Sequence, residues 1–111
     1  SASSVKKNNL LDKEFIYQSL DIVEFFEREK VNKVDLISMN IEGGEYELLN
    51  RIIDTGIIKK IKSLMIQFHF IKFSKNEIQV YKNIIKNLEK THQQLWNYPY
   101  VWEKWEIKKN N

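Results

Sequence analysis

The sequence holds 111 residues, with a hydrophobic fraction of 42%, a charged fraction of 30% and a formal net charge of +3. This content predicts one packed domain and excludes a disordered chain. The absence of cysteine excludes disulfides and thiolate metal sites. No apolar run is long enough to span a membrane, so no membrane partner is expected and the cytoplasm is the expected location. Arg28 and Arg51 are the two arginines, and this scarcity argues against nucleic-acid recognition.

The chain is expected to divide into a polar amino-terminal segment, residues 1–18, and a folded domain, residues 19–111. Ser1–Asn9 is expected to be frayed, and its first four residues resemble a cloning remnant. Leu10–Tyr17 is apolar but irregular. It is expected to form a short extended piece or to lie over the core.

Helical and strand patterns then alternate along the chain. They predict a helix over residues 21–30 capped by Asp21, a buried strand over 34–41, a helix over 45–55 ended by Gly56, a strand over 63–71, and a helix opened by the Ser74 capping box.

An aromatic tail closes the chain and is interrupted by Pro99. It predicts two strands or a broken hairpin. Its aromatic side chains are expected chiefly to fill the core: Trp96, Tyr98, Tyr100, Trp102 and Trp105. The whole pattern predicts an α/β fold of about four strands with flanking helices, in which strands 34–41 and 63–71 are parallel neighbours.

The turn after the first strand is the leading candidate site. A strand end followed by two glycines exposes backbone amides at a helix N-terminus, which favours an anion or a polar ligand. The candidate binding residues are Asn40, Gly43, Gly44 and Glu45, with Glu42 as a candidate acid or base. The alternative is a tight turn in which Glu45 complements the helix dipole.

His69 is the second candidate, because it lies near the end of the strand over 63–71, close to where substrate is expected. It could act as a general base, or it could be a strand histidine bonded to a neighbouring group. Gln67 lies on the same face and could orient it. His92, at a helix end, is expected to be structural through the helix dipole. No metal site is expected, since no third ligand accompanies the histidines.

The motifs in residues 35–49, 67–71, 90–92 and 98–103 resemble FkbM-type methyltransferases. The resemblance covers roughly residues 19–107 and fits the carboxyl-terminal half of a Rossmann-like methyltransferase sheet. It implies S-adenosylmethionine as methyl donor, a small-molecule acceptor such as a sugar hydroxyl, His69 and Glu42 as catalytic residues, and a substrate side lined by Asn40, Gly43 and Gly44. Similar enzymes usually carry aspartate where Asn40 stands, so basicity is lost there.

The rest of a cofactor site is missing from the sequence. No Gly-x-Gly turn is present, although an adenosyl site usually needs one. The chain alone is therefore expected to be inactive and to bind S-adenosylmethionine weakly. The alternative function is a non-catalytic α/β interaction domain of the same ancestry. The strand over 34–41 is expected to be an exposed sheet edge, covered by Leu10–Tyr17 or paired in a homodimer.

Overall fold

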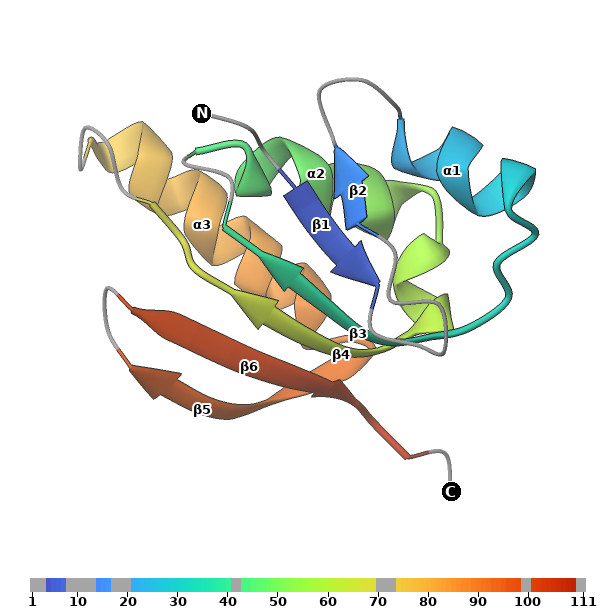
Figure 1. Ribbon diagram of the computed structural model, residues 1–111. Coiled ribbons are helices and arrows are strands. Elements are labelled where there is room, and N and C mark those ends of the chain that lie inside the picture. Colours follow the sequence, from blue (N-terminus) through green and yellow to red (C-terminus); the bar gives the residue numbers. More distant parts are fainter. Residues whose placement is uncertain are drawn as a thin grey trace.

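The computed structural model describes residues 4–7, 14–16, 21–40, 43–69, 74–98 and 101–109. They form an α/β fold in which a six-stranded mixed sheet carries its helices on one face (Figure 1). The elements follow in chain order: β1 (Ser4–Lys7), β2 (Glu14–Ile16), α1 (Ile22–Arg28), β3 (Val34–Met39), α2 (Glu45–Asp54), the 3-10 helix η1 (Ile57–Lys60), β4 (Ile61–Ile66), α3 (Lys75–Leu88), β5 (His92–Tyr98) and β6 (Trp102–Ile107).

The strand order across the sheet is β2-β1-β3-β4-β6-β5. Strands β3 and β4 are parallel, with Val34 opposite Ile61 and Met39 opposite Ile66, and α2 connects them. This confirms the α/β fold and the parallel pair. Strand β6 is antiparallel to β4 and to β5, so the aromatic tail forms the expected hairpin. Strands β3 to β6 are the four that the sequence predicted.

The two further strands come from the amino-terminal segment. Ser4–Lys7, which was expected to be frayed, forms β1 and pairs antiparallel with β3. Glu14–Ile16 pairs with β1 and not with β3. The edge of β3 therefore has a partner strand within the chain. The other residues of Leu10–Tyr17 lie outside the described residues.

The helix ends follow the predicted local chemistry. The Asp21 side chain accepts a hydrogen bond of 2.8 Å from the Val23 amide and so caps α1. The Ser74 hydroxyl accepts one of 3.1 Å from the Glu77 amide at the start of α3. Gly56, after α2, has φ of +82°, the left-handed conformation that glycine adopts without strain.

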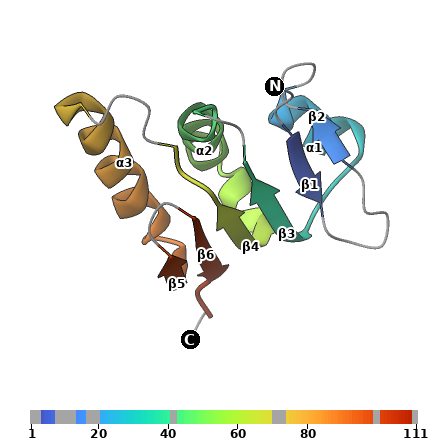
Figure 2. The same cartoon turned by 60° about the vertical axis from the view of Figure 1, so that its left-hand side comes forward.

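The core lies between the sheet and the helices (Figure 2). Ile37, Leu64 and Trp105 are opposite one another on three adjacent strands and are 1%, 0% and 1% exposed. On the other face Leu36 and Met65 are only half-buried. The expectation that the strand over 34–41 is covered on both faces is therefore wrong, because the described helices pack on one face only.

Candidate functional site

The candidate site lies at the carboxyl ends of β3 and β4, which meet at one edge of the sheet because the strands are parallel. The Gln67 amide donates to the Met39 carbonyl at 3.0 Å and extends the pairing beyond β4. Asn40 follows β3 and is exposed. Gly43, with φ of +102°, and Gly44 then turn the chain into α2. Glu42 lies outside the described residues.

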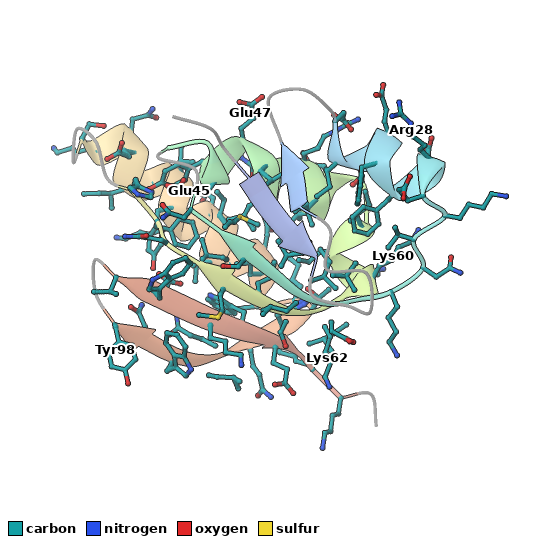
Figure 3. All side chains as sticks on the ribbon, viewed as in Figure 1. Arg28, Glu45, Glu47, Lys60, Lys62 and Tyr98 are labelled. Carbon is teal, nitrogen blue, oxygen red and sulfur yellow. The ribbon has the colours of Figure 1, made fainter. Side chains whose placement is uncertain are left out.

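Glu45 is the organising residue of this edge. It is the first residue of α2 and is 0% exposed. Its Oε2 accepts a hydrogen bond of 2.9 Å from the Gly43 amide, and its Oε1 accepts one of 2.6 Å from the His69 amide. A helix N-terminus stabilises such a carboxylate. Glu45 thereby joins the glycine turn to the segment that follows β4. Figure 3 labels the position of Glu45 on the ribbon.

His69 is held through its backbone and its ring. Its ring Nδ1 lies 3.2 Å from Glu45 Oε1, and its carbonyl accepts a hydrogen bond of 3.0 Å from the Tyr46 hydroxyl. The imidazole remains 27% exposed. A carboxylate can only accept hydrogen bonds, so this contact is a hydrogen bond when Nδ1 carries a proton. The arrangement holds a partly exposed imidazole at the edge of the sheet.

The same contacts explain why β4 ends at Ile66 and not at residue 71 as predicted. The backbone N–H and C=O of His69 bind the side chains of Glu45 and Tyr46. These two backbone groups are therefore unavailable for pairing with a neighbouring strand. Phe70 and Ile71 lie outside the described residues.

Tyr46 is a site residue that the sequence analysis missed. Burial, followed by the charges of Glu45, Glu77 and Glu103, raises the pKa of Tyr46 above its ordinary value. Its hydroxyl therefore stays a donor to the His69 carbonyl. The available signal was a tyrosine beside Glu45 in the first turn of the amphipathic helix α2.

A second buried carboxylate lies beside this edge. Glu103, 6% exposed, accepts hydrogen bonds from Tyr81 at 2.6 Å, Trp105 at 3.0 Å and Gln94 at 3.2 Å. Burial, then the hydrogen bond and charge of Glu103, raises the pKa of Tyr81. Phe68 packs edge-on to Tyr81 with ring centroids 4.8 Å apart. Glu103 thus fixes α3 to the terminal hairpin.

The hairpin presents apolar side chains at the same edge. Tyr98 and Val101 are 62% and 51% exposed, and the rings of Trp96 and Tyr98 lie 5.2 Å apart. The core-filling role expected of the aromatic tail is confirmed for Trp105 and wrong for Tyr98. With Phe68 and Glu103, part of the hairpin encloses a hollow of about 20 Å³. Tyr100 lies outside the described residues.

His92 is structural, as predicted, but for another reason. It is 0% exposed, with Nε2 at 2.8 Å from the Ile61 carbonyl and Nδ1 at 2.8 Å from the Thr91 hydroxyl. Burial lowers the pKa of His92, and the hydrogen bond to Ile61 opposes this only in part. A neutral ring gains nothing from the helix dipole, so the expected dipole role is wrong.

Two features are absent from the described residues. These residues contain no group of three or more His, Cys, Asp or Glu side chains placed to hold a metal ion. They also contain no helix with the length and hydropathy that crossing a membrane requires.

The profile of the methyltransferase FkbM domain matches residues 2–100. The chain belongs to the FkbM methyltransferase family. The resemblance seen in the sequence is thereby confirmed. The matched range of this FkbM domain includes β1, which the sequence analysis did not predict, and β2, which lies in the segment expected to be extended. Comparison with curated proteins and with solved structures found no match.

Within the FkbM domain, Glu45, Tyr46 and His69 meet where open α/β sheets bind ligands, outside the carboxyl ends of the strands. The structure brings Gly43 and Gly44 to this cluster through the Glu45 bond to the Gly43 amide. Gln67 lies beside it and is half-buried. Asn40 lies at the strand end and makes no hydrogen bond to a described side chain.

Proposed function

We propose that this FkbM domain serves S-adenosylmethionine-dependent O-methylation, with His69 as the general base for an acceptor hydroxyl. The observation that carries the proposal is the contact between the buried Glu45 carboxylate and the His69 ring at 3.2 Å. A base oriented by a buried acid is the arrangement that general base catalysis requires.

His69 and Glu45 have separate roles in this mechanism. Nε2 of His69 accepts the proton of the acceptor hydroxyl as the oxygen attacks. The ring then becomes cationic, and the Glu45 carboxylate at Nδ1 stabilises that cation. Glu45 itself is 0% exposed, so it positions His69 and does not touch substrate. Methyl transfer otherwise depends mainly on alignment of the reacting atoms.

S-adenosylmethionine, when bound, supplies an electrophilic methyl group. The hollow beside Phe68 measures about 20 Å³, which is too small for its adenosyl part, and the Gly43 amide is already bonded to Glu45. We therefore assign no described residue to the donor. We assign Asn40, Gly43, Gly44 and Gln67 to the acceptor side, and the catalytic role of Glu42 remains a prediction.

We infer that the acceptor is a small molecule with a sugar hydroxyl. Aromatic side chains bury large apolar area at low entropic cost and stack on the apolar faces of ring ligands. Tyr98, 62% exposed, and its neighbour Trp96 offer such a surface on the terminal hairpin. The absence of nucleic-acid and membrane partners, the cytoplasmic location and the homodimer remain predictions from the sequence.

The test is transfer of labelled methyl from S-adenosylmethionine to a panel of sugars by the protein that contains this chain. His69→Ala keeps the backbone bonds to Glu45 and Tyr46, so we expect turnover to fall by about 10²–10⁴-fold with little loss of stability. Glu45→Gln should lower turnover and shift its pH profile. Glu47→Gln, at an exposed position of the same helix, is the matched control. Near-normal turnover by His69→Ala would overturn the role of His69, and absence of transfer to every acceptor would overturn the activity.

A non-catalytic interaction domain is the second candidate. It is favoured by the small hollow and by the engagement of both Glu45 oxygens within the protein. Titration calorimetry of the chain with S-adenosylmethionine and its demethylated product tests this second candidate. A dissociation constant near 1 µM, about −8 kcal/mol, would reveal a donor pocket and exclude the non-catalytic domain.

A further inference from the structure

The opposite edge of the sheet, at the amino ends of β3 and β4, carries a group of lysines, which we call the lysine edge. Its members come from the segment after α1, from η1 and from β4: Lys30, Lys33, Lys59, Lys60 and Lys62. All five are exposed. Figure 3 places Lys60 and Lys62 at the end of the sheet away from Glu45.

The lysines surround a hollow in the surface. A cavity of about 220 Å³ is lined by four of them, together with two apolar side chains: Lys33, Lys59, Lys60, Lys62, Ile61 and Ile107. A second cavity of about 410 Å³ shares Lys60 with the first and is also lined by Lys30. The five ammonium groups can therefore approach a ligand from several sides, because their stems are long and flexible.

The positive charge of the lysine edge is not neutralised by the described part of the chain. No described carboxylate forms an ion pair with any of the five lysines. Acidic residues do lie around the lysine edge: Glu27 lines the larger cavity, Glu29 precedes Lys30, and Asp35 and Glu106 lie on the adjoining strands. Like charges gathered around a hollow repel one another, and a multiply charged anion would relieve that repulsion.

Lys30 adds an independent observation. It follows α1 and has φ of +51°. Among the described residues, no other side-chain-bearing residue has a positive φ. The Lys30 and Val31 amides bond to the carbonyls of Glu27 and Phe26 in the helix-ending pattern that usually places glycine at this position. A lysine here costs backbone strain and places an ammonium group beside the hollow.

We propose that the lysine edge binds a multiply charged phosphate compound, at a site separate from the methyl-transfer edge. Lysine binds phosphate as a point charge without fixed geometry, which suits several phosphates held in a shallow hollow. Arginine, which binds phosphate in a bidentate manner, is absent from the cavity lining. The phosphates can belong to a free compound or to a lipid headgroup, since both present the same chemistry. The proposal does not depend on the methyl-transfer mechanism.

The first experiment titrates the full chain with inorganic tripolyphosphate by calorimetry. We expect binding that weakens between about 50 mM and about 300 mM salt, because exposed charges are screened. Lys59→Gln with Lys62→Gln should weaken binding by about tenfold, or about 1.4 kcal/mol. Lys33→Gln with Lys60→Gln repeats the test from the other side of the hollow. Lys82→Gln with Lys86→Gln, the same charge change on exposed positions of α3, should leave affinity within about twofold.

The second experiment identifies the source of the phosphate. Flotation with vesicles containing a phosphatidylinositol bisphosphate is compared with flotation on phosphatidylcholine vesicles. Retention only on the phosphoinositide vesicles, lost in Lys59→Gln with Lys62→Gln, indicates a lipid headgroup, and tripolyphosphate binding without retention indicates a free compound. Absence of binding in both assays overturns the proposal. Equal weakening in the lysine-edge and α3 variants also overturns it, since net charge alone would then explain the binding.

Discussion

At the carboxyl ends of β3 and β4, the carboxylates of Glu45 and Glu103 are buried and accept hydrogen bonds from protein donors. At the amino ends of the same strands, the lysines of the lysine edge are exposed and form no ion pair within the described residues. The difference follows from the cost of burial. A buried charge must find its donors inside the protein, which fixes the surrounding backbone. An exposed charge is solvated and stays available to a ligand. One end of the sheet is therefore built for precise placement and the other for adaptable attraction.

The largest effect should come from Glu45→Ala. The change leaves the Gly43 and His69 amides without their acceptor and removes the partner of the His69 ring. Each buried polar group left unpaired costs about 1–3 kcal/mol, so we expect a loss on the order of 3 kcal/mol in the free energy of unfolding. Urea denaturation measures it. Glu47→Ala, at an exposed position of the same helix, should change stability by less than about 0.5 kcal/mol. Equal losses would show that the carboxyl edge is not fixed by its buried charge.

The features predicted from sequence are those set by neighbouring residues. The caps at Asp21 and Ser74 and the left-handed Gly56 depend on local chemistry and were found where expected. The parallel pair follows from two apolar runs separated by an amphipathic helix. His69 was placed correctly near the carboxyl end of the second strand for the same reason, and its role at a ligand site stays a prediction.

The features missed are those that depend on distant contacts. Glu45 bonds to His69 across 24 residues, and Tyr46 bonds to the same residue across 23. No periodicity in the sequence encodes such a contact. The short, polar β1 is likewise held by pairing with β3 and not by its own pattern. Propensity gives way to tertiary context in such segments.

A smaller effect is expected from His92, which is an exception to the comparison between the two ends of the sheet. His92 lies at the amino end of β4 beside Ile61, where the lysines are exposed, but is itself buried. Burial lowers the pKa of the folded-state ring below its unfolded value of about 6.5. The unfolded chain therefore binds the proton first as pH falls. The contribution of the neutral His92 ring to the free energy of unfolding is fully present above about pH 6.5. Below that pH it declines, by up to about 1.4 kcal/mol per pH unit. Thermal or urea unfolding at about pH 7.5 and about pH 5.5 measures the decline.

The control for this pH effect is the other histidine. His92→Gln should flatten the pH dependence over this range, although it lowers the overall stability. His69→Ala should leave the dependence in place. A dependence that survives His92→Gln would assign it to carboxylates and not to His92.

The smallest effect should come from Lys30→Gly. With φ of +51°, Lys30 holds a conformation that costs a side-chain-bearing residue roughly 1 kcal/mol and costs glycine little. Glycine also adds freedom to the unfolded chain, which offsets part of the gain. We expect a net rise of roughly 0.5 kcal/mol in unfolding free energy, together with weaker tripolyphosphate binding. Lys90→Gly is the matched control, because Lys90 also follows a helix but lacks a positive φ. It should lower stability slightly. A Lys30→Gly variant that gains stability and keeps full phosphate affinity would separate the strain at Lys30 from the function of the lysine edge.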